Sequence, residues 1–276
     1  VIVLAPITFW VYFEALFFPP PKTQYFYISP RKKPIFVDQK KEIDKQNQIT
    51  NLIDLELSKL SGDYAVIIKD LASPLEYKKN ETKTFTSASI YKLAVMYKIF
   101  DMLENKQLLE TDQILPGQTV KEALNLMITV SDNNSALALA EKAGWANIDL
   151  LLNSEKISGF NLNRESPTTT AQAISTLLER IYDNKAVSQN SSIKMKELLL
   201  AQKVNDRIPK YLPTEIKVAH KTGELDFIRH DAGIVYGKKS DYIFIFLSKT
   251  PAPGNATENI ANLSKKIFDS LEAPSP

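Results

Sequence analysis

The sequence predicts a mixed α/β (α+β) protein in which strands near both ends of the chain enclose a helical middle. Strand-like runs occur at 64–68 and 75–77, and again at 216–219, 231–236 and 242–248. Between these groups the apolar residues recur at the spacing of a helix. The chain has 276 residues, of which 44% are hydrophobic, so it can bury a sizeable core. This order is typical of a sheet with an inserted helical lobe, and a cleft between two lobes is a common binding site.

The helices are predicted from apolar side chains that recur every three or four residues. In the segment 89–103, for example, Leu93, Met96, Ile99 and Phe100 would share one face. The segments with this spacing are 43–60, 89–103, 119–129, 134–143, 168–182, 191–202 and 260–271.

Charge and cysteine content exclude several classes of function. Lys and Arg number 34 against 32 Asp and Glu, for a net charge of +2, whereas a nucleic-acid-binding protein usually carries a larger, clustered basic excess. The chain has no cysteine, which excludes disulfides, thiolate zinc sites and a cysteine nucleophile. Only His220 and His230 could supply imidazole, so a histidine-rich metal site is not expected.

The first residues predict a membrane anchor. Residues 1–18 are apolar except for Thr8 and Glu14, and as a helix they would span about 27 Å, close to the thickness of a bilayer core. Prolines follow directly, without the small-residue site of a cleaved signal peptide. We therefore expect an uncleaved anchor at 1–18, a stalk at 19–44 and a catalytic domain at 45–276, exported and held outside the cytoplasm. The alternative is that 1–18 forms a buried core helix.

Ser89 and Lys92 form an S-x-x-K tetrad at the start of a predicted helix. A serine hydroxyl attacks efficiently only when a base takes its proton, and residues i and i+3 lie on one helix face, so Lys92 could reach Ser89. The lysine can act as a base if burial or a neighbouring cation lowers its pKa. The tetrad also occurs at 29–32 and 191–194, and a single S-x-x-K is more often a solvated helix face.

Two further motifs each occur once. Ser131-Asp132-Asn133 lies between two predicted helices, where a second serine could relay a proton to a leaving nitrogen; alternatively these residues form a helix N-cap. Lys221-Thr222-Gly223 follows the predicted strand 216–219. Its lysine could polarise the second serine and attract a carboxylate, and its glycine would let a substrate lie against the strand edge. The alternative is a basic strand end followed by a bend.

In this order, the three motifs resemble those of class A β-lactamases and penicillin-binding proteins. The flanking segments 120–140, 167–173 and 219–231 resemble the same family, and the resemblance covers about residues 45–272. It implies a serine β-lactamase/D,D-peptidase-like fold, with a five-stranded antiparallel sheet packed by helices beside an all-helical lobe. It also implies that the protein needs no metal and no organic cofactor.

The resemblance assigns the acylation chemistry to four residues. Ser89 matches the acylated nucleophile, Lys92 its proton acceptor, and Ser131 the relay to the leaving nitrogen. The backbone N–H groups of Ser89 and Glu224 match the oxyanion hole.

The resemblance also assigns substrate contacts. Asn133 matches a contact to the substrate amide, and Lys221 and Thr222 match the anchors of its carboxylate, with Lys221 also polarising the second serine. Gly223 completes this motif.

One departure from the family pattern bears on turnover. Class A β-lactamases carry an omega loop with a Glu-x-x-x-Asn pair, whose glutamate activates the water that hydrolyses the acyl-enzyme. Here the segment 159–167 is much shorter and lacks that pair. Glu165 is its only carboxylate and a possible deacylation base, although Arg164-Glu165 better matches the ion pair at the neck of the usual loop.

These observations predict a membrane-tethered, monomeric serine hydrolase that forms an acyl-enzyme with β-lactams and hydrolyses the β-lactam amide slowly. One alternative is a D-alanyl-D-alanine carboxypeptidase of the penicillin-binding type, acting in cell-wall metabolism on D-Ala-D-Ala peptides. Another is a sensor that is acylated once and stays acylated. The expected partners are a β-lactam or a D-Ala-D-Ala peptide and the membrane, with no nucleic acid.

Overall fold

A five-stranded antiparallel sheet forms the centre of the computed structural model, which describes residues 39–273. The strand order is β2-β1-β9-β8-β7, so the strands from the two ends of the chain meet in the middle and β7 lies at an edge. The strands of the sheet are β1 (Asp63–Asp70), β2 (Glu76–Lys79), β7 (Lys217–Leu225), β8 (Ile228–Tyr236) and β9 (Asp241–Lys249). The predicted fold class and sheet are confirmed.

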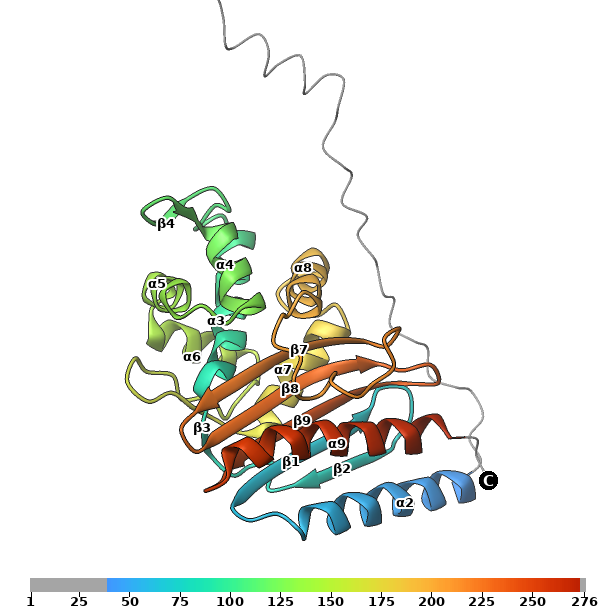
Figure 1. The fold of residues 1–276 in the computed structure, drawn as a ribbon. Helices are drawn as coiled ribbons and strands as arrows, with labels where there is room; N and C mark the ends of the chain where they lie inside the picture. The colour runs from blue at the N-terminus through green and yellow to red at the C-terminus, as the bar shows by residue number, and fades with distance from the viewer. Residues whose placement is uncertain (1–38, 274–276) are drawn as a thin grey trace, which may run out of the picture.

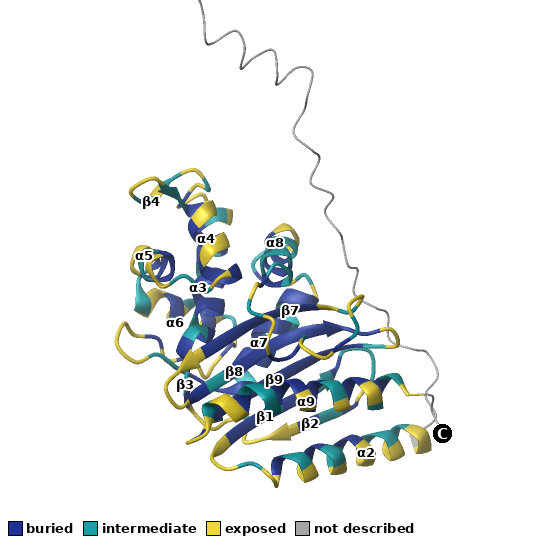
Figure 2. Cartoon of the chain, in the orientation of Figure 1, coloured by how far each residue is buried: buried dark blue, intermediate teal, exposed yellow. Residues whose placement is uncertain are grey.

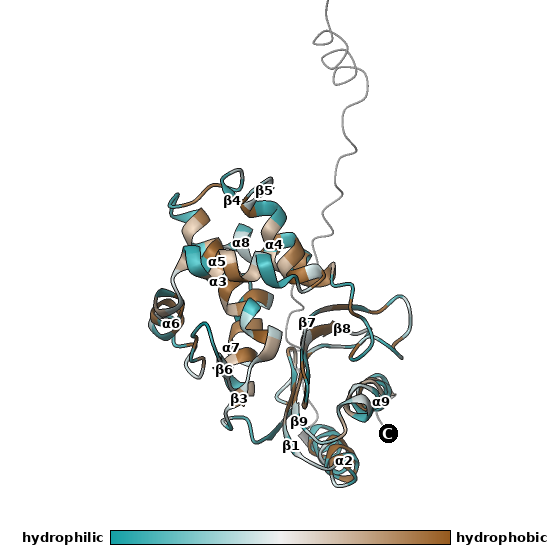
Figure 3. Ribbon diagram, turned by 60° about the vertical axis from the view of Figure 1, so that its left-hand side comes forward, coloured by the Kyte–Doolittle hydropathy of each residue, from teal (hydrophilic) through white to brown (hydrophobic). Residues whose placement is uncertain are grey.

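Helices cover both faces of this sheet (Figure 1). The two helices α2 (Gln39–Leu57) and α9 (Pro253–Glu272) pack together on one face, as the turned view of Figure 3 shows. A helical lobe lies on the other face. The lobe contains the 3-10 turn η1 (Ala88–Tyr91) and the helices α3 (Lys92–Glu104), α4 (Val120–Thr129), α5 (Asn133–Ala143), α6 (Trp145–Ser154), α7 (Ala171–Tyr182) and α8 (Gln189–Leu200). Two small ladders complete it, β3 (Phe85–Thr86) with β6 (Thr168–Thr169) and β4 (Gln113–Leu115) with β5 (Gln118–Thr119).

The sheet separates two apolar cores. Successive side chains of a strand point to opposite faces, so in β1 Ala65 and Ile67 join the core beneath the lobe, while Val66 and Ile68 join the core beneath α2 and α9. Figure 2 shows the resulting dark interior of the sheet. Burial on both faces explains why the strands read as nearly continuous apolar runs in the sequence.

The largest difference from the predicted elements concerns β7. The sequence predicted a strand that ends before Lys221-Thr222-Gly223, but β7 runs to Leu225 and this motif lies inside it. The reason is that β8 pairs with it over its whole length, from Lys217↔Tyr236 to Leu225↔Ile228. Helix α6 was not predicted at all, because it follows α5 after the single residue Gly144.

The predicted anchor and most of the predicted stalk lie outside the described residues. Helix α2 begins at Gln39, so the last residues assigned to the stalk, 39–44, are helical. Within residues 39–273, no helix is both long enough and apolar enough to cross a bilayer. The same part of the chain holds no group of three or more His, Asp or Glu side chains arranged to bind a metal ion.

Candidate active site

Ser89 lies on the 3-10 turn η1, directly before α3. The preceding residue, Ala88, has a φ of +45°, a left-handed conformation that costs a non-glycine residue about 1–3 kcal/mol. The surrounding structure holds this strained turn in place. The ladder of β3 and β6 lies just before it, and the backbone N–H of Ser87 donates to the carbonyl of Pro167 at 2.8 Å. The Ser89 side chain remains partly exposed, so a substrate can reach its hydroxyl.

Gly223 allows β7 to pass close to this turn. A Cβ atom at Gly223 would lie 3.0 Å from Cγ1 of Ile90, 3.2 Å from the carbonyl oxygen of Ser87 and 3.3 Å from Cβ of Ala88. A larger residue would therefore push η1 away from the strand. The missing side chain makes room for the turn that carries the nucleophile, whereas the sequence had suggested that it makes room for substrate.

The side chain of Lys92 is completely buried at the start of α3. Its Nζ donates to the carbonyl oxygen of Ser131 at 2.6 Å, to Oγ of Ser131 at 3.2 Å and to Oδ1 of Asn133 at 2.8 Å. Burial lowers the pKa of Lys92 to about 8, against the opposing effect of the Asp132 carboxylate. A useful fraction of this amine is therefore neutral near physiological pH, as proton abstraction requires.

Ser131 joins α4 to α5 in a left-handed conformation, with a φ of +61°. Its Oγ accepts hydrogen bonds from Nζ of Lys92 at 3.2 Å and from Nζ of Lys221 at 2.9 Å. Because both lysines donate to this oxygen, its own hydrogen is available to another acceptor. The next residue, Asp132, caps α5 by accepting from the N–H of Ser135 at 2.7 Å. The motif thus caps a helix and also faces the two lysines.

Lys221 approaches Ser131 from β7 and is also completely buried. Its Nζ donates to the carbonyl oxygen of Thr222 at 2.9 Å as well as to Ser131. Burial is the main cause that lowers the pKa of Lys221 to about 7, and the charge of Lys92 acts in the same direction. Two buried amines around one hydroxyl are costly to maintain, and such perturbed groups cluster at catalytic sites.

The Ser89 hydroxyl itself forms no hydrogen bond with the rest of the described chain. The expected contact between Ser89 and Lys92 is not made, because Nζ of Lys92 donates to Ser131 and Asn133 instead. Ser89 lies in the 3-10 turn, and Lys92 follows that turn as the first residue of α3. The site thus brings together a reachable serine, a buried amine one turn away, and a second serine held by two lysines.

Comparison with known proteins identifies the family to which this chain belongs. The sequence pattern of the β-lactamase enzyme family matches residues 44–271. The chain belongs to this family. It is accordingly a serine β-lactamase-like hydrolase, although no curated protein matches it in sequence.

Solved structures of the β-lactamase and penicillin-binding type share the fold. The TLA-1 extended-spectrum β-lactamase superposes with a TM-score of 0.76 at 18% identity, over 83% of this chain and 100% of that one. PBP-A superposes with a TM-score of 0.75 at 19% identity, over 88% of this chain and 99% of that one. A PBP-A mutant in an acyl-enzyme complex with penicillin G gives a TM-score of 0.75 at 18% identity, over 83% and 97% of the two chains.

In this β-lactamase-family chain, the segment before β6 is short and closed. Asn161 and Thr168 exchange two backbone hydrogen bonds, at 3.0 and 2.9 Å, which leaves only residues 162–167 in the loop between them. Glu165 is exposed in this loop, and its carboxylate has no hydrogen-bond or ion-pair partner among residues 39–273. It is therefore not held against the lysines or Ser131.

The predicted ion pair between Arg164 and Glu165 is wrong. Arg164 instead pairs with Glu141 at 3.1 Å, and both side chains are largely exposed. The backbone N–H of Glu165 bonds to Oδ1 of Asn163 at 3.1 Å, within a local turn that points the loop residues outward. Neighbouring opposite charges in a sequence do not pair when such a turn separates their side chains.

The S-x-x-K tetrad at 191–194 has only structural partners. Ser191 donates to Glu104 at 2.9 Å, and Lys194 donates to Glu110 at 2.6 Å. This agrees with its interpretation as an ordinary helix face. The tetrad at 29–32 lies outside the described residues.

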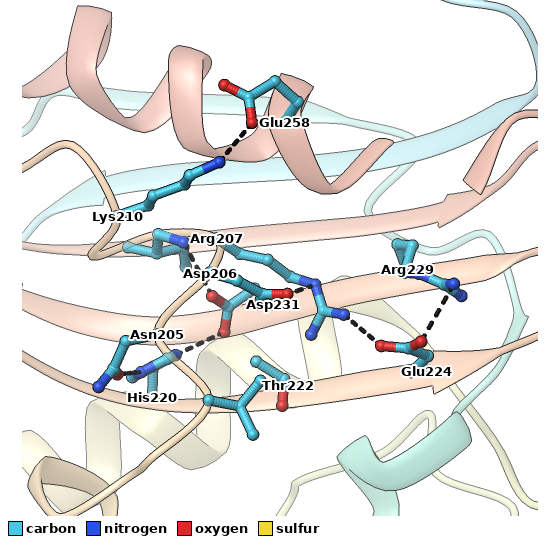
Figure 4. A network of polar contacts seen from close by, with 12 residues as sticks. Asn205, Asp206, Arg207, Lys210, His220, Thr222, Glu224, Arg229, Asp231 and Glu258 are labelled. Atoms are coloured by element: carbon cyan, nitrogen blue, oxygen red, sulfur yellow. Dashed lines mark hydrogen bonds and ion pairs between the residues drawn. The ribbon is translucent and has the colours of Figure 1, made fainter. Parts of the chain in front are cut away.

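The sequence did not reveal an arginine beside the K-T-G motif. Arg207 is only 1% exposed, and its Nη2 donates to Oε2 of Glu224 at 2.6 Å. The other oxygen of Glu224 lies 3.0 Å from Nη2 of Arg229 on β8, so one carboxylate joins two guanidinium groups (Figure 4). Arg207 lies in an irregular segment after α8 without a recognisable motif. The Arg229 contact follows from the strand register, in which Glu224 faces Arg229.

A second buried pair lies on the same strands. Nδ1 of His220 lies 2.9 Å from Oδ1 of Asp231, and its Nε2 lies 3.0 Å from Oδ1 of Asn205 (Figure 4). Asp231 also accepts from the N–H of Ile208 at 3.0 Å. His220 is thus a packed strand residue, and it ties the segment that carries Arg207 to the sheet.

Proposed function

We propose that this protein is acylated on Ser89 by β-lactams and hydrolyses the β-lactam amide slowly. The observation that carries the proposal is the convergence of two buried amines, Lys92 and Lys221, on the Ser131 hydroxyl beside the Ser89 turn. In the other S-x-x-K tetrad of the described chain, Ser191 and Lys194 contact Glu104 and Glu110 instead.

In the first step, neutral Lys92 takes the proton of the Ser89 hydroxyl while Oγ of Ser89 bonds to the β-lactam carbonyl carbon. The carbonyl oxygen becomes an oxyanion, which the backbone N–H groups of Ser89 and Glu224 stabilise. Support for this assignment comes from the position of Ser89 in the first turn of a helix, where N–H groups lack an intrahelical acceptor.

In the second step, the carbon–nitrogen bond breaks and the leaving nitrogen takes a proton from Ser131. Oγ of Ser131 accepts hydrogen bonds from both lysines, which supports its role as the donor. The proton that Lys92 received from Ser89 can then pass to Ser131, so the amine returns to its neutral form.

Substrate binding falls to Asn133, Thr222 and Lys221. Oδ1 of Asn133 accepts from Lys92, which fixes the orientation of the amide and turns its NH₂ group away from the lysine. That group is the donor expected for a substrate carbonyl. Thr222, next to Lys221 on β7, supplies a hydroxyl for the substrate carboxylate.

Deacylation should be slow because, among the described residues, the short loop holds no carboxylate against the two lysines or Ser131. Loss of a general base typically slows a step by about 10²–10⁴-fold. Glu165, the carboxylate of the short loop, is exposed and has no partner within residues 39–273. The acyl-enzyme should therefore accumulate.

A second candidate is a D-alanyl-D-alanine carboxypeptidase that β-lactams inhibit, and the short, closed loop 162–167 favours it. The structural similarity to PBP-A also favours it, since one of the similar structures is a PBP-A mutant in an acyl-enzyme complex with penicillin G. If the rate of deacylation were close to zero, the protein would stay acylated and could act as a sensor.

A mixing experiment with a chromogenic cephalosporin tests the proposal. Sustained turnover after a burst supports a slow β-lactamase, and a single stoichiometric burst supports the peptidase or the sensor. Intact-protein mass spectrometry should show one penicillin adduct that is lost in Ser89→Ala and kept in the control Ser191→Ala. An adduct that survives Ser89→Ala would refute the assignment of the nucleophile.

We also propose that residues 1–18 anchor the protein in a membrane, with the catalytic domain outside the cytoplasm. The apolar sequence of this segment supports the proposal. So does a substrate class, cell-wall peptides or β-lactams, that is found outside the cytoplasm.

A further inference from the structure

The side chain of Glu224 places a negative charge at the position where an anionic substrate is expected to bind. Glu224 lies on β7 two residues after Thr222, and alternate residues of a strand share one face about 7 Å apart. Its side chain is 56% exposed, so it borders the solvent from which a substrate arrives.

The cations beside Thr222 are already partly neutralised by this carboxylate. Glu224 contacts Arg207 through one oxygen, at 2.6 Å, and Arg229 through the other, at 3.0 Å (Figure 4). Arg207 also has Asp206 at 3.7 Å from its Nε. The positive charges of the two arginines are therefore already balanced by the carboxylates of Glu224 and Asp206. A substrate carboxylate that binds here gains less attraction than it would from free arginines.

Arg207 nevertheless keeps unused donors. It is 1% exposed, and its Nε and Nη1 form no hydrogen bond with any residue of the described chain. A buried guanidinium with unpaired N–H groups is unfavourable unless a ligand completes it. A ligand oxygen that binds there must lie close to the carboxylate of Glu224, which repels it if it is charged.

We propose that Glu224 is a specificity-determining residue that weakens the preference of Lys221 and Thr222 for a substrate carboxylate next to the leaving nitrogen, and so favours substrates with a neutral ester or amide there. The inference rests on the proposed acylation of Ser89, because the substrate is placed by that reaction. It differs from the backbone role expected of Glu224, since it concerns the charge of the side chain.

The test compares benzylpenicillin with its neutral methyl ester. The second-order rate constant of acylation is measured for both in the parent and in Glu224→Gln, which keeps the size of the side chain and removes its charge. Removal of the repulsion should raise the carboxylate-to-ester ratio by about tenfold. The matched control is Glu215→Gln, which removes the same charge from an ion pair with Lys238 and should leave the ratio unchanged.

A ratio that stays constant or falls in Glu224→Gln overturns the proposal. Glu224→Thr, which suits a strand, serves as a second variant should Glu224→Gln fold poorly. If neither compound acylates even the parent, the proposed function fails. The effect of the Glu224 charge is then measured from ligand binding instead of acylation. N-acetyl-D-alanine should then bind about tenfold more tightly to Glu224→Gln than to the parent, with N-acetyl-D-alaninamide unaffected, as measured by NMR titration. Equal changes for acid and amide would count against Glu224.

Discussion

Nε2 of His230 donates a hydrogen bond to the carbonyl oxygen of Thr86 at 2.9 Å and so joins β8 to β3, the strand before the nucleophile. The other ring nitrogen, Nδ1, accepts from the backbone N–H of Ser248 on β9, at 3.0 Å. The ring is fully buried and must be neutral to make both bonds. Burial lowers the pKa of His230 to about 4. A histidine that belongs to no catalytic motif therefore holds the Ser89 turn against the sheet.

This histidine predicts how stability depends on pH. Its pKa is about 4 in the folded protein and 6.5 in an unfolded chain, so between these values the unfolded state binds more protons. The free energy of unfolding should therefore fall as the pH drops from about 6.5 to about 4, by up to about 3 kcal/mol from this residue. Urea unfolding of the parent and of His230→Gln across this range measures it. The variant should be less stable at neutral pH but lose less stability in acid, and equal acid slopes would contradict the prediction.

The pH profile of acylation should report on Lys92 and respond to Asp132. Since Lys92 must be neutral to act, the acylation rate of the free enzyme should rise with pH, with a midpoint near about 8. The Asp132 carboxylate favours the charged amine, so Asp132→Asn should move the midpoint down, by less than about one pH unit. Asn also caps helices well, so α5 should remain intact. A midpoint that stays in place or rises would show that Lys92 does not set the profile.

Glu165→Gln should leave deacylation unchanged. The carboxylate is exposed and has no partner within residues 39–273, so its loss should alter the lifetime of the penicillin adduct by less than about twofold. Mass spectrometry over time measures that lifetime, with Arg164→Gln as a control in the same loop. A long-lived adduct in Glu165→Gln that the parent clears quickly would identify Glu165 as the base and the protein as an efficient β-lactamase.

A chain that starts at Gln39 should keep the acylation rate of the full-length protein. This cut retains all of α2, whose Ile49 and Ile53 are fully buried beneath the sheet. The full-length protein should sediment with membranes and the shortened one should not. The contrasting control is Ile53→Ala in the shortened chain, which should lose about 2–5 kcal/mol of stability through the cavity it creates. A shortened chain that fails to fold would place residues 1–38 in the core and refute the anchor.

The sequence predicted what depends on periodicity and on short motifs. The five strands and most of the helices follow from apolar spacing, because both faces of the sheet are buried. The tetrad at Ser89 and the motifs at Ser131 and Lys221 lie together, as expected from their order in the chain.

The sequence could not show contacts that depend on backbone conformation or on irregular segments. Nothing in the sequence indicates the left-handed conformations of Ala88 and Ser131, since neither residue type favours a positive φ. Arg207 reaches the site from a segment without regular structure, so no hydrophobic periodicity in the sequence could predict its position. The ion pair of Arg164 was assigned to its neighbour in sequence, whereas the folded chain brings it to Glu141.

The strand order also dictates when the active site can form during synthesis. Strand β1 is made early and β9 late, yet they pair along their whole length, from Asp63↔Lys249 to Asp70↔Tyr242. Until β9 is available, β1 lacks its neighbour in the centre of the sheet, and β8 lacks the strand that links it to β1. Contacts so distant along the chain slow folding, since the intervening segment must first be closed into a loop. Ser89 thus leaves the ribosome long before the strands that position it, and a chain that ends after Gly223 but before β9 begins at Asp241 would carry all three motifs without an assembled site.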